Sequence, residues 1–551
     1  MGVPILHDDG TDTQRHDAFT MIGGLMSVLS EPPLFPIASH AEMTPVDHLV
    51  RAASVHGGRL AVVDGDLRLT YAELFDECGR QAGALVNLGV APGDRVAVLA
   101  PNSSALLQAH YSIPMAGAVL VALNTRLAPH ELAAIVEHSG SKVIIVEEEL
   151  LSKAADIRSR VITAGKFRES AVNAPFTHRP VQDERSLISL NYTSGTTGLP
   201  KGVMYHHRGA YLQSVAMAYH LRLGVDTVYL WTLPMFHCNG WTFPWAVVAA
   251  GGTQVCQRRV IPSESWRLIR DEGANCMCAA PVVLSDLARA PEAASLDIRV
   301  TVATGGSPPS PTLLAEMDRL GFDVIHLYGF TETFGPTVVS PWYPEWDELP
   351  EEQRARLKAR QGAPNIVSQP LCVVAQDGHV VAKDGQEMGE LWLRGNNVTL
   401  GYFQDPEHTE TAYANGWFRT GDLAVWHSDG IIELRDRSKD VIISGGENIS
   451  SIEVEQVLLA HPSIAEAAVI AGTHPRWGEV PVAFVTLRDG RAFTEAELID
   501  WSRERLAHFK APTRVIFSHL PKSSTGKIQK VQLRANLRSL DSNVSPHPDQ
   551  A

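Results

Sequence analysis

The sequence predicts an α/β fold with a large N-terminal body of several sheets and a small C-terminal α+β domain. Short apolar strands alternate with helical segments as far as about residue 400, which is typical of largely parallel sheets covered by helices on both faces. A second group of strands and helices follows residue 440. The chain of 551 residues is also long enough for several hydrophobic cores.

The body is expected to begin after a polar segment, residues 1–40, that forms a loose extension. RVAVLA at 95–100 predicts a short strand, and the following SALLQAHYSIPMAGA has the apolar spacing of a helix. VLVALN and KVIIVEE predict two more strands. This strand, helix, strand order favours a parallel sheet.

The C-terminal domain follows a change of composition. SSIEVEQVLLAHP and TEAELIDWSRERLAHF predict helices, and IAEAAVIAG and PVAFVTL predict strands. We expect an N-terminal domain over 41–436, a linker over 437–440, a C-terminal domain over 441–540 and a disordered tail over 541–551.

Composition argues against several partners and locations. The 47 Lys and Arg residues stand against 62 Asp and Glu residues, a formal charge of −15, which disfavours non-specific binding to nucleic acid or anionic lipid. No apolar run reaches the roughly 20 residues of a membrane span, and the N-terminal segment lacks a secretory pattern. Of six cysteines only Cys276 and Cys278 are closely spaced, and two ligands cannot close a zinc site. We therefore expect reduced thiols and a cytoplasmic protein.

The most informative segment joins an alternating strand, SLISLNY, to the loop TSGTTGLPKG at 193–202. This loop supplies backbone N–H groups, hydroxyls and the Lys201 ammonium with little steric bulk, so it can surround a polyphosphate. It is not a Walker A loop, because Lys201 follows Pro200 and precedes Gly202. Taken alone, a loop of this composition is more often a flexible surface turn.

Five more segments extend the pattern in a fixed order. They are ATGGSPPSP, HLYGFTET, GWFRTGDLA, LRDRSKDVIISGGENIS and PKSSTGKIQK. Together with the loop they cover about 185–530 and resemble the signature of the adenylate-forming superfamily, which includes acyl-CoA synthetases, peptide-synthetase adenylation domains and beetle luciferases. The resemblance implies that a carboxylate displaces pyrophosphate from ATP. Such a site must offset the repulsion between two anions and hold the attacking and leaving oxygens in line.

The resemblance also implies roles for individual residues, with ATP, Mg²⁺ and coenzyme A as ligands. Asp422 would bind the ribose hydroxyls, Thr331 the α-phosphate and Glu332 the Mg²⁺. Lys527 would stabilise the charge that develops in the transition state. Without the motifs, these residues are ordinary surface or turn residues. The implied catalytic residues are Lys527, Thr331, Glu332 and His237. The implied ATP-binding residues are Thr193, Ser194, Gly195, Thr196, Thr197, Gly198, Lys201, Gly305, Gly306, Ser307, Tyr328, Gly329, Thr331, Asp422, Arg437 and Lys527.

Members of this superfamily swing the small domain between two half-reactions, so the resemblance implies a mobile C-terminal domain. Its hinge would include Lys439 and Asp440, in a short polar segment that absorbs large dihedral changes. The segment SGGEN would then approach the pantetheine arm. The implied CoA-binding residues are Ser444, Gly445, Gly446 and Glu447.

The acyl pocket is the least certain part of the pattern, because motifs do not fix a substrate. His237, Trp241 and Gly329 are its implied residues. If Trp241 faces the cavity it shortens it, which favours a short or medium acid; it is equally well explained as core. The nearest resemblance is to enzymes for short and medium fatty acids and methylmercaptopropionate. A stand-alone enzyme that delivers the adenylate to a carrier protein, an amine or another nucleophile is the alternative. The resemblance also allows a homodimer, which is common in the family.

Overall fold

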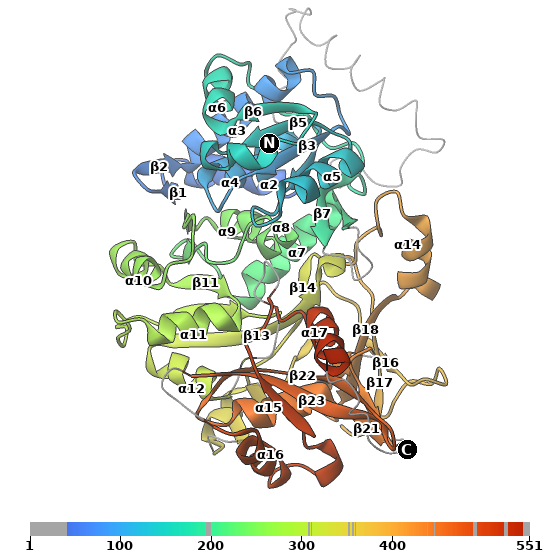
Figure 1. The fold of residues 1–551 in the computed structure, drawn as a ribbon. Coiled ribbons are helices and arrows are strands. Elements are labelled where there is room, and N and C mark those ends of the chain that lie inside the picture. Colours follow the sequence, from blue (N-terminus) through green and yellow to red (C-terminus); the bar gives the residue numbers. More distant parts are fainter. Residues whose placement is uncertain are drawn as a thin grey trace, which may run out of the picture. The chain divides into compact units, whose positions relative to one another are not determined.

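In the computed structural model, a six-stranded and a nine-stranded sheet form the large body, and two smaller sheets come after them along the chain (Figure 1). Residues 43–551 group into one compact unit. The structure describes residues 41–193, 200–306, 309, 311–350, 353–354, 357–358, 360–437, 439–445, 447–488, 493–522 and 527–543. The predicted extension over 1–40 and the predicted tail beyond residue 543 lie outside these ranges.

The first sheet has six strands in the order β6-β5-β3-β4-β7-β8. The strands are β3 (Arg95–Leu99), β4 (Val119–Ala122), β5 (Ser141–Val146), β6 (Arg160–Thr163), β7 (Leu187–Thr193) and β8 (Lys201–His206). All pairs are parallel except β7 with β8. Every residue of β4 is buried, as expected for a central strand covered on both faces. Figure 1 shows this sheet among the helices α3 (Tyr71–Asn87), α4 (Ser104–Met115), α5 (Pro129–Ser139) and α6 (Ala164–Val172).

The second sheet has nine strands in the order β15-β14-β13-β12-β11-β9-β10-β1-β2. The strands are β1 (Leu60–Asp64), β2 (Leu67–Thr70), β9 (Val228–Leu230), β10 (Thr253–Val255), β11 (Cys276–Ala279), β12 (Val300–Thr304), β13 (Phe322–Phe330), β14 (Gly335–Val339) and β15 (Ala363–Pro364). From β13 to β1 the pairs are parallel, and the edges are antiparallel. The segments between its strands carry the helices α9 (Phe243–Ala250), α10 (Pro262–Asp271), α11 (Pro281–Arg289) and α12 (Pro311–Arg319), while α2 (Val46–His56) precedes β1 and α7 (His207–His220) precedes β9 in the chain. Parallel strands end at one edge of a sheet, so the segments after β12 and β13 come together there.

The third and fourth sheets are smaller. The third is antiparallel, with β16 (Cys372–Val374), β17 (Met388–Leu393), β18 (Phe418–Trp426) and β19 (Ile432–Arg437), and α14 (Pro406–Ala412) precedes β18. The fourth comprises β20 (Ile442–Ser444), β21 (Glu447–Ile449), β22 (Ile464–His474), β23 (Gly478–Leu487) and β24 (Arg514–Phe517). Its helices are α15 (Ser451–Leu459), α16 (Glu495–Arg503) and α17 (Lys530–Asn543).

The structure confirms the predicted α/β class and the strands expected at 95–100 and in VLVALN, KVIIVEE, IAEAAVIAG and PVAFVTL. The last predicted helix is shorter than expected. It begins at a capping box, in which the Thr494 side chain accepts a hydrogen bond from Glu497 N and Glu497 accepts one from Thr494 N. It ends at Arg503, and a 3₁₀ turn follows at His508–Lys510.

The boundaries of the linker and of the C-terminal domain stay predictions. The long helix α17 continues to Asn543, three residues past the expected end of that domain. Within the described ranges, no helix combines the length and the apolar composition that crossing a membrane requires.

Candidate active site

Tyr328, Asp422 and Arg437 form a continuous set of contacts between the second and third sheets. The Tyr328 hydroxyl, near the end of β13, donates a hydrogen bond to Asp422 Oδ2 (2.8 Å). Asp422 lies opposite Arg437 in the β18–β19 ladder, and Arg437 Nε is 3.1 Å from Asp422 Oδ1. From the described residues, Oδ1 accepts no well-directed hydrogen bond, although Asp422 is only 5% exposed. A buried carboxylate oxygen of this kind can accept a hydrogen bond from a ligand hydroxyl.

The surroundings of this carboxylate act on its charge in opposite directions. Burial raises the pKa of Asp422, and the positive charge of Arg437 opposes that shift. Burial, followed by the negative charge of Asp422, raises the pKa of Tyr328. Tyr328 therefore stays a hydrogen-bond donor at neutral pH.

The hairpin of β7 and β8 brings a lysine to the same region. Thr193 at the end of β7 pairs with Lys201 at the start of β8. Residues 194–199, between the two strands, lie outside the described residues.

Glu332 lies in a 3₁₀ turn, Thr331–Thr333, between β13 and β14. Its Oε1 accepts a hydrogen bond from the Tyr402 hydroxyl (2.7 Å), and the Lys201 ammonium lies 5.0 Å from the centre of the Tyr402 ring. Burial raises the pKa of Glu332, while the Tyr402 hydrogen bond and the charge of Lys201 oppose the rise. A partly buried acid and a nearby cation thus contact the same tyrosine.

Lys527 brings a second ammonium close to Asp422 and Arg437. Burial, followed by the charge of Arg437, lowers the pKa of Lys527 to about 8, and Asp422 opposes that shift. The residue as a whole keeps an exposed surface, and the neighbouring cations Arg437 and Lys439 also lower its pKa. Burial, with a contribution from Lys527, lowers the pKa of His237 to about 4. His237 is therefore neutral at physiological pH.

The segment after His237 has an uncommon backbone. Cys238, Asn239, Gly240, Trp241 and Thr242 all have positive φ, between 49° and 67°, so the short element α8 (Cys238–Trp241) is a left-handed turn. Non-glycine residues pay about 1–2 kcal/mol each for this conformation.

Contacts from β7 hold this turn in place. Asn239 Oδ1 accepts hydrogen bonds from Ser189 Oγ and Asn191 Nδ2 (both 2.7 Å), and Asn239 N donates to Asn191 Oδ1 (3.2 Å). The same strand thus leads into the phosphate-type loop and fixes the strained turn. The turn also presents Cys238 Sγ to Thr331 Oγ1 at 3.3 Å.

Trp241 lies between two glycines. A Cβ atom on Gly305 would be 3.1 Å from Trp241 Cη2, and one on Gly335 would be 3.0 Å from Trp241 Cδ1. A Cβ atom on Gly329 would be 2.0 Å from the Gly335 carbonyl oxygen. These positions leave no space for side chains, and the indole between Gly305 and Gly335 is only 8% exposed.

The predicted hinge is tied to α17. Arg534 donates hydrogen bonds to Asp440 Oδ1 and to the Lys439 carbonyl oxygen (3.3 Å). Gly445, with a φ of 61°, lies against Trp477, whose ring would be 2.9 Å from a Cβ at that position. Ser444 is buried, whereas Gly445 and Glu447 are exposed.

The structure therefore brings Lys201, Tyr328, Glu332, Asp422, Arg437, Lys527 and His237 into one electrostatically connected region. Gly306 is exposed after β12. Eight predicted or hinge positions lie outside the described residues: Ser194, Gly195, Thr196, Thr197, Gly198, Ser307, Ser438 and Gly446.

Sequence reasoning missed Tyr402, Asn191 and Asn239. Each acts through a partner 48 to 70 residues away in the chain, which no local pattern reveals. The only local signal was Asn191 next to the motif that begins at Tyr192.

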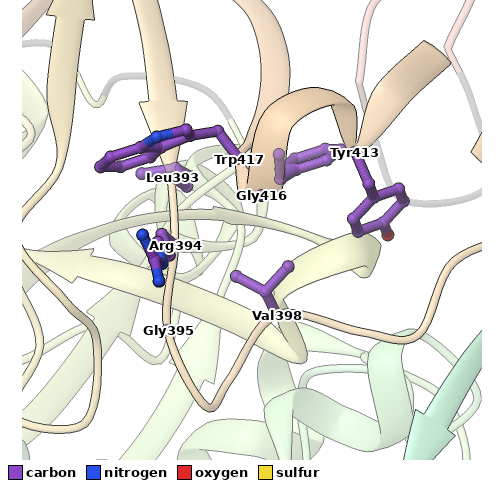
Figure 2. Close-up of a pocket in the computed structure, with 8 residues that line it drawn as sticks. Leu393, Arg394, Gly395, Val398, Tyr413, Gly416 and Trp417 are labelled. Carbon is purple, nitrogen blue, oxygen red and sulfur yellow. The ribbon is translucent and has the colours of Figure 1, made fainter. Parts of the chain in front are cut away.

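A cavity of about 280 Å³ lies apart from these residues. Figure 2 shows it bordered by the rings of Trp417 and Tyr413, with Arg394 and Val398 close by. None of the residues lining this cavity belongs to the predicted site.

A site with two lysines, an arginine, a buried carboxylate and a partly buried one, next to the ends of parallel strands, is typical of a nucleotide-binding α/β enzyme. The chain belongs to the AMP-binding enzyme family. The model of the AMP-binding enzyme matches residues 49–403, and that of the AMP-binding enzyme C-terminal domain matches residues 453–527.

Relatives cover nearly the whole chain. The acetate/butyrate–CoA ligase AAE7, peroxisomal, of Arabidopsis thaliana is 40% identical, over 93% of this chain and 97% of its own. The peroxisomal benzoate–CoA ligase of the same plant is 41% identical, and the match covers 90% of this chain and 93% of that protein. The o-succinylbenzoate CoA synthetase (MenE) of Bacillus subtilis, solved with the acyl-adenylate intermediate OSB-AMP, is 31% identical with a TM-score of 0.79, over 88% and 97%. The structure of the same enzyme in complex with ATP and magnesium ion is 31% identical in sequence, with a TM-score of 0.77; the match covers 88% of this chain and 99% of that chain.

Proposed function

We propose that this chain is an AMP-forming acyl-CoA synthetase, which joins a carboxylic acid to coenzyme A at the expense of ATP. The observation that carries the proposal is the convergence of Lys527, Arg437 and Asp422 on the region of Glu332 and Lys201. The CoA ligases that cover this chain at about 40% identity support the same activity.

In the first half-reaction, the acid's carboxylate oxygen forms a bond to the α-phosphorus, and the bond from that phosphorus to the β-bridging oxygen breaks. The two anions must be brought together against their repulsion. Lys527 supplies a cation whose charge matches the negative charge that accumulates in the transition state. Asp422 accepts hydrogen bonds from the ribose, and Arg437 keeps that buried carboxylate ionised.

In the second half-reaction, the CoA thiolate attacks the acyl carbon and AMP leaves. We propose that the C-terminal domain swings about Lys439 between the steps, and that Ser444, Gly445, Gly446 and Glu447 then approach the pantetheine. The polar segment between two sheets and the exposed Gly445 support this. Neutral His237 can line the path between carboxylate and thiol without repelling Lys527.

Magnesium fits the residues present. Among the described residues there is no group of three or more His, Cys, Asp or Glu side chains that could hold a metal, and Mg²⁺ is usually held by one or two carboxylates together with phosphates and waters. Glu332, partly buried and hydrogen-bonded through one oxygen, is the carboxylate we assign to it. When bound, the ion neutralises polyphosphate charge.

We propose short or medium acids as substrates. The Trp241 indole fills the space between Gly305 and Gly335, which would limit the depth of an acyl pocket that opens beside these glycines. The relatives named for acetate and butyrate support small acids, and the relative named for benzoate shows how widely such ligases vary.

Location and assembly are also proposals. We propose a cytoplasmic enzyme on the basis of composition, which fractionation of the native cells measures. We propose a homodimer by analogy with the family, which light scattering measures.

The test of the function is pyrophosphate release with Mg-ATP across acids of increasing chain length and aromatic acids, with and without CoA. We expect acid-dependent pyrophosphate without CoA and thioester only with CoA. Trp241→Ala is expected to shift the preferred acid to a longer one. Adenylate that never becomes thioester would indicate a carrier protein or another nucleophile as the acceptor.

A further inference from the structure

Tyr402 lies between two groups that the proposed function places at the polyphosphate, yet none of the six motifs contains it. We propose that Tyr402 is a positioning residue that holds the Glu332 carboxylate and the Lys201 ammonium apart, each in place for magnesium-bound ATP. The inference rests on the proposed function. It is carried by two contacts: the hydroxyl donates to Glu332 Oε1 at 2.7 Å, and the ring centre is 5.0 Å from Lys201 Nζ.

Two different parts of one side chain serve two opposite charges. The electron-rich ring face attracts the ammonium, and the hydroxyl donates to the carboxylate in a charge-assisted hydrogen bond. Glu332 accepts the hydrogen bond from the Tyr402 hydroxyl, so the carboxylate also orients the phenol.

Without this arrangement Lys201 and Glu332 have reason to pair with each other. Lys201 is close enough for its charge to act on Glu332, and opposite charges attract strongly where water is scarce. Nevertheless, no ion pair within 4.0 Å joins them in the described part of the chain. If Lys201 and Glu332 formed an ion pair, the Lys201 ammonium would be less available to phosphate and the Glu332 carboxylate less available to Mg²⁺.

Tyr402 is itself fixed from both sides. It is 8% exposed, and its backbone N donates to Thr409 Oγ1 (2.9 Å). It forms an isolated bridge with Val203 on β8, the strand that begins with Lys201.

The same segment reaches the turn that carries Glu332. Thr399 N donates to the Glu332 carbonyl oxygen (3.0 Å). The segment 399–402 therefore spans from the strand of Lys201 to the turn of Glu332, which suits Tyr402 to set the distance between them.

The experiment compares equilibrium binding of a fluorescent ATP analogue to the full chain with and without Mg²⁺. The ratio of the two dissociation constants is the magnesium gain. Tyr402→Phe keeps the ring and removes the hydroxyl, so we expect the magnesium gain to fall about tenfold, the scale of one hydrogen bond to a charged group.

Tyr413→Phe is the matched control. Its ring packs against Tyr402 at 6.1 Å, borders the cavity of Figure 2, and its hydroxyl is hydrogen-bonded to Thr399 Oγ1 (2.7 Å) rather than to Glu332. Like Tyr402→Phe, this variant loses one phenol hydroxyl, from a ring that lies beside Tyr402. We expect its magnesium gain to match that of the wild type.

A second readout separates positioning from folding. Adenylate formation needs the polyphosphate contacts, whereas conversion of supplied acyl-AMP and CoA to thioester does not. Tyr402→Phe should slow the first about tenfold and leave the second unchanged. An unchanged magnesium gain, or equal loss in both half-reactions, overturns the inference. If the wild type binds no ATP and forms no adenylate, the proposed function fails instead.

Discussion

The lowered pKa of Lys527 makes the first half-reaction sensitive to alkaline pH. Burial and the charge of Arg437 bring this pKa to about 8, so the ammonium that the transition state needs is lost as the pH rises through that value. A lysine with a lowered pKa is charged below that pKa and neutral above it. The adenylation rate should therefore fall on the alkaline side.

The size of the effect follows from the ionised fraction. A lysine with a pKa of about 8 is about 90% charged at pH 7 and about 10% charged at pH 9. Single-turnover release of pyrophosphate, measured without CoA so that the thiol does not titrate, should fall about tenfold between those two values.

The matched variant is Lys527→Arg, whose guanidinium stays charged throughout this range. The adenylation rate of this variant is expected to be lower, because the planar guanidinium does not place its charge as a compact ammonium does. Its rate should nevertheless stay constant between pH 7 and pH 9. Lys439→Arg is the control for the other lysine whose pKa is lowered, first by burial and then by Arg437. A wild-type rate that stays level to pH 9, or an arginine variant at position 527 with the same decline, would refute the reasoning.

Three further predictions concern other parts of the site. His237 has a pKa lowered to about 4, so its ring proton signals in an NMR titration should not shift between about pH 5.5 and 8; a midpoint near 6.5 would contradict its burial. Gly329→Ala places a Cβ 2.0 Å from the Gly335 carbonyl oxygen, so the free energy of unfolding should fall by about 3 kcal/mol in urea titration, whereas an unchanged midpoint would mean that β14 gives way easily. Arg534→Ala removes the partner of Asp440. Burial alone would raise the Asp440 pKa, but the Arg534 hydrogen bond and the surrounding cations lower it below 3.8. That pair stabilises the fold above the unfolded pKa, so urea unfolding at pH 7 should show a loss of about 2 kcal/mol that shrinks below about pH 4; a loss independent of pH would point to packing instead.

The strands and the class of fold could be predicted because apolar runs such as VLVALN are buried along their whole length. The order of the nine-stranded sheet could not. It places β1 and β2 beyond β10, about 190 residues away in the chain, and no local pattern encodes such a pairing.

The site divides in the same way. Lys527, Asp422 and Arg437 were found through motifs, and the structure brings their charges together. The left-handed turn at Cys238–Thr242 was missed because its non-glycine residues disfavour positive φ. That conformation is imposed from β7, through Asn191, which is a tertiary effect.

The most direct test of the central claim is the product balance of a single reaction. The purified chain is incubated with butyrate, Mg-ATP and CoA, and the nucleotides and thioester are quantified by mass spectrometry. The account predicts AMP, pyrophosphate and butyryl-CoA in equal amounts, with none formed by Lys527→Ala. ADP and phosphate as the products, or undiminished thioester formation by that variant, would contradict it.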